Sequence, residues 1–149
     1  MTEYLETIVD KFTFKVASDR LYTAEGVWAL QAGDQMRVGL SDFLQQRSGD
    51  IAFVEPVAPG KQVKAGDEIA IIETIKVNVS LMSPLSGTVT RVNPQLETTP
   101  DVLNQDPYGE GWLCEIEAGD WAAEQVNLLD APTYFARMKR EAEEETNRP

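Results

Sequence analysis

Between residues 51 and 117 the sequence is a succession of short apolar runs, rich in Val and Ile, separated by Gly, Pro, Asp and Ser. Runs of about 4–8 such residues between turn residues are typical of β-strands rather than helices. Strands are therefore expected over 51–54, 69–75, 77–82, 88–92 and 112–117, and residues 62–64 precede a turn over 65–67. This pattern predicts a mainly β fold.

The rest of the chain is expected to frame this centre. Two strands over 26–31 and 35–40 should be joined at Gly33, since Gly adopts positive φ at little cost. Ser41 should cap a short helix over 42–47 that ends at Gly49. Further predictions are a loop over 93–111, helices over 120–129 and 133–145, and one possible edge strand over 12–16. We expect a single domain, 1–149, with an N-terminal extension (1–19) and a C-terminal helix and acidic tail (133–149).

The net charge of −12 limits the partners that this chain can have. Nucleic acids and anionic membranes would repel it, whereas basic protein surfaces would attract it; acidity for solubility alone is an equally good explanation. Cys114 is the only cysteine, so no internal disulfide can form, and a reducing, cytoplasmic location is expected. We expect Cys114 to be buried as a small apolar residue, because the chain has no His to activate it.

Lys76 stands alone inside an apolar β-type run. A charged side chain in such a run is expected at a turn, with its amine in water. Gly60 and Gly87 lie in the flanking turn regions, and we predict that Gly87 adopts a positive φ, so that Ala there costs about 1 kcal/mol. Lys76 could be an ordinary hairpin lysine. However, no nucleophile with a base and no phosphate-binding loop is present, which favours a carrier of a covalent group over an enzyme.

Several segments together resemble the lipoyl-carrying H-protein family of the glycine cleavage system, over residues from about 21 to 138. They are Val38-Gly39-Leu40-Ser41-Asp42-Phe43, Gly49-Asp50-Ile51-Ala52-Phe53-Val54-Glu55, Glu73-Thr74-Ile75-Lys76, Ser83-Pro84-Leu85-Ser86-Gly87-Thr88-Val89 and Asn104-Gln105-Asp106-Pro107-Tyr108-Gly109-Glu110-Gly111-Trp112-Leu113. The resemblance implies a flattened barrel-sandwich of two antiparallel sheets with short peripheral helices and a C-terminal helix.

The resemblance also implies the cofactor and its site. Lys76 would carry lipoic acid as an amide, and Glu73 would help a lipoylating enzyme to recognise the hairpin. Thr74, Ile75 and Val77 complete the attachment segment. Biotin is disfavoured, because it is usually attached within Met-Lys-Met. The arm would serve partner oxidoreductases of a multienzyme system, with dihydrolipoamide dehydrogenase among them.

Two departures from the family pattern bear on the pathway. Glu25-Gly26-Val27-Trp28 replaces the usual His-Glu-Trp. The family usually continues from the attachment lysine as Lys-Ala-x-Ser-Asp/Glu, whereas Lys76 is followed by Val77-Asn78-Val79-Ser80-Leu81, which is bulkier and lacks the acid. They favour the lipoate-binding protein branch, which serves cytoplasmic sulfur-compound oxidation with a heterodisulfide-reductase-like complex. The alternative is a glycine cleavage H-protein that carries an aminomethyl group between glycine decarboxylase and aminomethyltransferase. A further alternative is an unmodified structural or adaptor domain.

Overall fold

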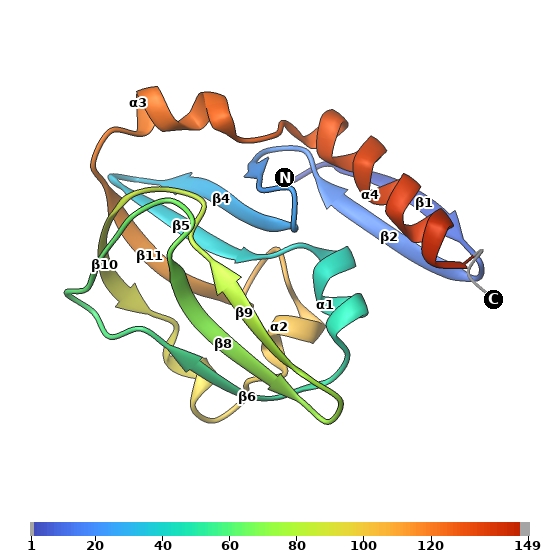
Figure 1. The fold of residues 1–149 in the computed structure, drawn as a ribbon, viewed down its shortest axis with the longest axis horizontal. Coiled ribbons are helices and arrows are strands. Elements are labelled where there is room, and N and C mark those ends of the chain that lie inside the picture. Colours follow the sequence, from blue (N-terminus) through green and yellow to red (C-terminus); the bar gives the residue numbers. More distant parts are fainter. Residues whose placement is uncertain (1, 147–149) are drawn as a thin grey trace.

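The computed structural model describes residues 2–146. Residue 1 of the expected extension and residues 147–149 of the expected tail lie outside that range. Two antiparallel sheets face one another (Figure 1). The larger has the order β3 (Leu21–Tyr22), β4 (Val27–Ala32), β5 (Gln35–Leu40), β11 (Trp112–Ala118), β10 (Gly87–Val92) and β7 (Gln62–Val63). The smaller has the order β6 (Ile51–Pro56), β8 (Glu68–Thr74) and β9 (Asn78–Met82).

The main core fills the space between these two sheets. Val38, Val89 and Ile116 of the larger sheet join Ile72 and Leu81 of the smaller sheet in one buried cluster. The alternation of apolar and polar residues along each strand produces this one-sided burial. The predicted mainly β sandwich of antiparallel sheets is thus confirmed, although no strand pairing between residues 2 and 146 closes it into a barrel.

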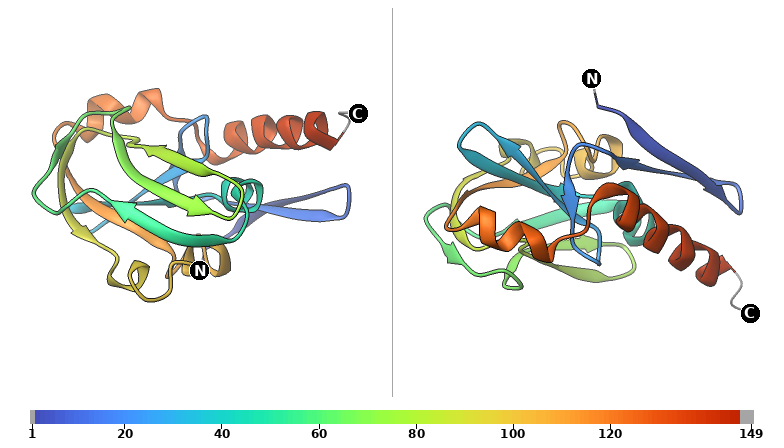
Figure 2. Two further views of the ribbon diagram at one scale, coloured as in Figure 1. Left: turned by 60° about the horizontal axis from the view of Figure 1, so that its bottom comes forward. Right: turned by 90° about the horizontal axis from the view of Figure 1, so that it is seen from above.

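A second lobe was not predicted. β1 (Tyr4–Val9) and β2 (Phe12–Ala17) form a separate hairpin, and α4 (Ala131–Thr146) packs against it (Figure 2). The sequence pattern predicts only an edge strand over 12–16. The missed turn consists of Asp10 and Lys11, both at positive φ (46° and 76°), where Gly or Asn would normally signal a hairpin. We call β1, β2 and α4 the hairpin lobe.

Short helices lie at the margins. α1 (Asp42–Ser48) is capped by Ser41, whose hydroxyl accepts the Leu44 N–H at 3.2 Å. The expected loop over 93–111 contains η1 (Pro94–Leu96) and α2 (Val102–Gln105). The expected helix over 120–129 is broken into α3 (Trp121–Glu124) and η2 (Gln125–Asn127), because Leu129 leaves the helix to pair with Tyr22. No helix within residues 2–146 has the length and hydropathy that a membrane span needs.

Candidate functional site

Lys76 lies at the tip of the β8–β9 hairpin. β8 ends at Thr74 and β9 begins at Asn78, so that Ile75, Lys76 and Val77 form the connecting turn. The hairpin projects from the smaller sheet at the same end of the molecule as the hairpin lobe (Figures 1 and 2). Lys76 is exposed, and it takes part in no ion pair with any other residue between 2 and 146. Its amine is therefore available to solvent and to an enzyme.

Thr74 holds the turn together. Its hydroxyl accepts the backbone N–H groups of Lys76 at 3.3 Å and Val77 at 3.1 Å, and donates to the Val77 carbonyl at 3.0 Å. The Thr74 N–H also donates to that carbonyl, at 2.9 Å. A hydroxyl that satisfies several turn groups restrains the backbone locally. The lysine thus projects from an ordered support.

Exposed apolar side chains lie in the turn that carries Lys76 and on the neighbouring strand β6. Ile75 is 92 % exposed, and Phe53 on β6 is 54 % exposed. Phe53 lies opposite Glu73 in the β6–β8 register, so it belongs to the same end of the sheet. The sequence analysis did not single out Phe53, because it stands in a continuous apolar run that does not indicate which side chains face solvent. Exposed apolar side chains that gather at one end of a sheet favour an interaction surface there.

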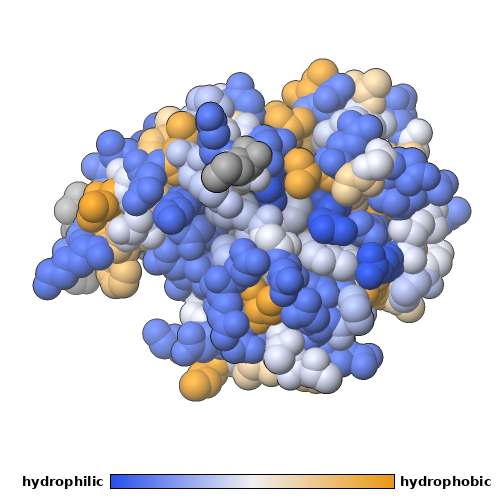
Figure 3. All heavy atoms as spheres, turned by 180° about the vertical axis from the view of Figure 1, so that it is seen from behind, coloured by the Kyte–Doolittle hydropathy of each residue, from blue (hydrophilic) through white to orange (hydrophobic). Residues whose placement is uncertain are grey.

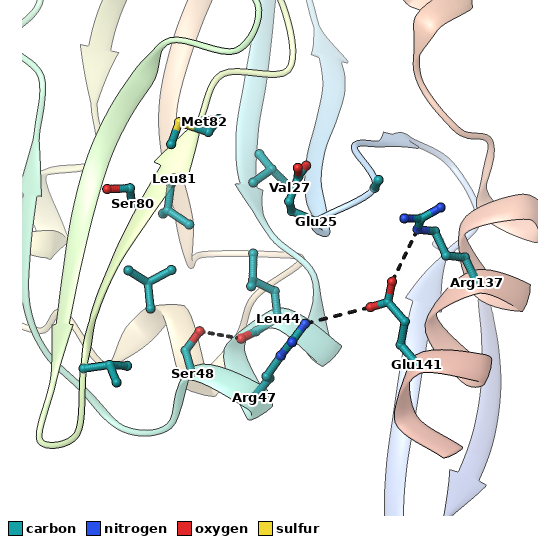
Figure 4. A pocket seen from close by; sticks show the side chains of 13 residues that line it. Glu25, Val27, Leu44, Arg47, Ser48, Ser80, Leu81, Met82, Arg137 and Glu141 are labelled. Atoms are coloured by element: carbon teal, nitrogen blue, oxygen red, sulfur yellow. Dashed lines mark hydrogen bonds and ion pairs between the residues drawn. The ribbon is translucent and has the colours of Figure 1, made fainter. Parts of the chain in front are cut away.

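A cleft of about 410 Å³ begins at the hairpin and runs along β9 (Figure 4). One wall is formed by β9 and the end of the turn, and the other by the segment before β4 and by α1. Charged side chains stand at the rim: Glu141 of α4 pairs with Arg137 at 3.4 Å and with Arg47 of α1 at 3.9 Å. The lining residues are Ala24, Glu25, Val27, Leu44, Arg47, Ser48, Val77, Val79, Ser80, Leu81, Met82, Arg137 and Glu141.

The two segments that differ from the family's sequence pattern both line this cleft. Glu25 and Val27 come from the segment that replaces His-Glu-Trp, while Val77, Val79 and Ser80 follow the lysine. In Figure 4 Glu25 and Val27 lie across the cleft from Ser80. Two segments that are far apart in the chain therefore form one surface beside Lys76.

Gly60 and Gly87 do not lie at the lysine. Gly60 donates its N–H to Val89 of β10 at 2.7 Å, and Gly87 begins β10 opposite Val63. The turn that precedes β8 is bonded to the end of β9 opposite the tip, since the Gly66 N–H donates to the Ser83 carbonyl at 2.9 Å, so this region lies away from Lys76. Gly60 has a φ of 95°, in the region that favours glycine.

The predicted positive φ of Gly87 is wrong. Gly87 is absent from the positive-φ glycines and has strand geometry. Glycine is needed there for a different reason: a Cβ would overlap the Glu117 carbonyl oxygen and come within 2.8 Å of Ile116 Cγ2. Close approach of β10 to β11, rather than a turn, therefore excludes a side chain.

Cys114 lies in β11 inside the main core, as expected. Burial, with the negative charge of Glu115 as a smaller cause, raises the pKa of the thiol from 9.0 to about 12. The thiol stays protonated near neutral pH and is a poor nucleophile. Residues 2–146 contain no cluster of three or more His, Cys, Asp or Glu that could hold a metal ion.

Comparison with known proteins gives a consistent result. The glycine cleavage H-protein family model matches residues 20–141. The glycine cleavage system H protein of Thermus thermophilus is 38 % identical over 127 residues, which cover 85 % of this chain and 98 % of that protein. The probable glycine cleavage system H protein of Natronomonas pharaonis is 42 % identical over 127 residues, covering 85 % and 98 %. The crystal structure of a glycine cleavage system H protein from Mycobacterium marinum superposes with a TM-score of 0.69 at 31 % identity, covering 80 % and 96 %.

Proposed function

Because the chain belongs to the glycine cleavage H-protein family, whose members are carrier subunits rather than catalysts, we propose that Lys76 carries lipoic acid for a glycine cleavage system. In this proposal residues 1–149 act as one carrier domain. The observation that carries it is the exposed amine of Lys76 at the ordered tip of the β8–β9 hairpin, inside the residues that the family model matches.

The residues around Lys76 fit a lipoyl group. The amine is exposed, so it can attack an activated carboxyl group of lipoic acid; an amide C–N bond forms as the bond to the activating group breaks, and that group and a proton are released. The amide has no charge, which removes the cost of bringing the lysine stem onto an apolar surface. Such a surface begins one residue away, where Val77, Val79 and Leu81 line the cleft.

The chain's own residues have positioning roles. Thr74 orders the turn, and Ile75 with Phe53 offers apolar contact to the enzymes that handle the arm. The β9 wall of the cleft can hold the hydrocarbon part of the arm and keep water from it. When bound, the lipoyl group supplies a disulfide that partner enzymes reduce and reoxidise.

The proposal takes glycine cleavage as the pathway. The sequence analysis preferred sulfur-compound oxidation, and the comparisons do not support that preference, since the relatives named above are glycine cleavage system H proteins. The partners are then a lipoylating enzyme, glycine decarboxylase, aminomethyltransferase and dihydrolipoamide dehydrogenase. No finding favours a heterodisulfide-reductase-like partner.

Reconstitution tests the pathway. The lipoylated chain replaces an authentic H-protein in an assay of glycine decarboxylation with the three other system enzymes. Comparable turnover at comparable carrier concentration is expected. Turnover no higher than with the Lys76→Arg variant, from a chain whose lipoylation is verified by mass, would contradict the proposed pathway.

A further inference from the structure

Among the residues that the structure describes, β1 has an unpaired outer edge in the hairpin lobe. The outer edge of β2, on the other side of the same hairpin, is bonded to the main body instead. Three outward backbone groups of β2 are satisfied by side chains of the main body. The Lys15 N–H donates to Asp42 Oδ2 at 2.9 Å, and the Lys15 carbonyl accepts from the Tyr108 hydroxyl at 2.7 Å. The Thr13 carbonyl accepts from Gln46 at 2.9 Å. The β2 edge is therefore closed.

The β1 edge has no such cover. In the antiparallel register Tyr4, Glu6 and Ile8 lie opposite Ala17, Lys15 and Thr13. Because Lys15 directs its N–H and C=O away from β1, its partner Glu6 directs its own away from β2, and Tyr4 and Ile8 follow by alternation. Within residues 2–146 these three residues have no backbone hydrogen-bond partner on that side, and β1 pairs only with β2.

Apolar side chains accompany this edge. Ile8 is 69 % exposed and Tyr4 is 46 % exposed. Figure 3, which shows the molecule from behind the view of Figure 1, has apolar surface broken by polar surface on the hairpin lobe. Exposed apolar side chains on an unpaired edge are a template for strand addition. β1 and β2 also lie outside residues 20–141, which the family model matches.

We propose that β1 is a docking strand that accepts an extended, basic segment of a partner enzyme of the glycine cleavage system, an inference that rests on the proposed function. The hairpin lobe and the Lys76 hairpin project at the same end of the molecule (Figure 2). An enzyme that binds β1 therefore holds the carrier from the side of the molecule on which the Lys76 hairpin projects (Figure 2).

The negative charge of the chain and of Glu6 favours a basic segment as the binding partner of the β1 edge. The chain carries a net charge of −12, and Glu6 stands at the centre of the open edge. A second copy paired symmetrically about Glu6 would set two carboxylates opposite each other, which is unfavourable across strands. A basic segment would place a cation against Glu6 and would be steered by the overall field.

Two substitutions at one position test the proposal. Glu6→Pro removes only an outward N–H, so the β1–β2 hydrogen bonds remain and the hairpin should fold, as Pro is accepted on strand edges. Glu6→Lys keeps the backbone and reverses the charge. Glu97→Lys, an exposed residue outside the hairpin lobe, makes the same charge change as a control. Thermal unfolding checks that each variant is folded.

The lipoylated full chain is titrated by calorimetry with purified glycine decarboxylase, aminomethyltransferase and dihydrolipoamide dehydrogenase, each alone. At least one enzyme should bind both Glu6 variants tenfold or more weaker than the wild type and Glu97→Lys. Equal binding of all variants, or no binding of the wild type, overturns the proposal. If Glu6→Pro weakens binding and Glu6→Lys does not, the inference that the partner segment is basic is overturned. If sedimentation shows that the wild type is a dimer and that Glu6→Pro is a monomer, the partner enzyme is rejected as the occupant of the β1 edge, and a second copy of this chain takes its place. If the wild type supports glycine decarboxylation while the Glu6 variants bind normally, only the docking strand is rejected and the proposed function stands.

Discussion

The hydroxyl of Thr74 bridges both backbone groups of Val77, accepting its N–H at 3.1 Å and donating to its carbonyl at 3.0 Å. This pair of bonds closes the turn that carries Lys76. The side chain that orders the attachment site therefore stands two residues before the lysine in the chain.

Replacing Thr74 should loosen the turn without unfolding the protein. Thr74→Val keeps the shape but removes the hydroxyl, and a net hydrogen bond is worth about 1 kcal/mol. Amide hydrogen exchange at Val77 should become about fivefold faster. Thr74→Ser, which keeps the hydroxyl, is the control and should exchange like the wild type. Unchanged exchange in Thr74→Val would show that the hydroxyl does not order the turn.

Gly87 and Gly60 should differ in their response to alanine. At Gly87 a Cβ meets the Glu117 carbonyl and Ile116, so overpacking should cost about 1–3 kcal/mol. At Gly60 nothing lies within 4 Å, and only the φ of 95° opposes Ala, at about 1 kcal/mol. Urea denaturation of Gly87→Ala and Gly60→Ala measures both costs. A Gly87→Ala variant as stable as the wild type would refute the close approach of the two strands.

Cys114 should make the fold sensitive to alkali. Its pKa is raised in the folded state from 9.0 to about 12, so the unfolded chain loses the thiol proton first. The contribution is complete below pH 9 and is lost as pH rises toward about 12. The stability of the wild type, measured by denaturation, should fall more steeply over that range than that of Cys114→Ala. The buried tyrosines are common to both proteins, so parallel curves would contradict this origin.

The sandwich was predictable because its signals are local. Short apolar runs between turn residues identified the longer strands of the two main sheets, but not the two-residue strands β3 and β7, and Ser41 with Gly49 marked α1. The β1–β2 hairpin was not predictable in the same way. Its turn uses Asp10 and Lys11 at positive φ without a glycine, and it is held by α4 from the other end of the chain. Long-range packing decides that element.

The site was predictable in its centre and not in its surroundings. A lone lysine in an apolar run indicates a turn, whereas the cleft depends on segments from β9, α1 and α4 that only the folded chain brings together. Gly87 shows the converse limit. The preceding Pro-Leu-Ser suggests a turn at this glycine. Glycine is required there because a Cβ would overlap the backbone carbonyl of Glu117, a residue far along the chain on the neighbouring strand.

The central claim is that Lys76 is the lipoyl attachment residue. The wild type and Lys76→Ala are treated with a lipoylating enzyme, lipoic acid and ATP, and are then analysed by intact mass and peptide mapping. The wild type should gain one lipoyl group, on the peptide that contains Lys76. Lys76→Ala should gain none while its stability changes by no more than about 0.5 kcal/mol, since the position is exposed. A lipoyl group on another lysine, or undiminished lipoylation of Lys76→Ala, would contradict the account.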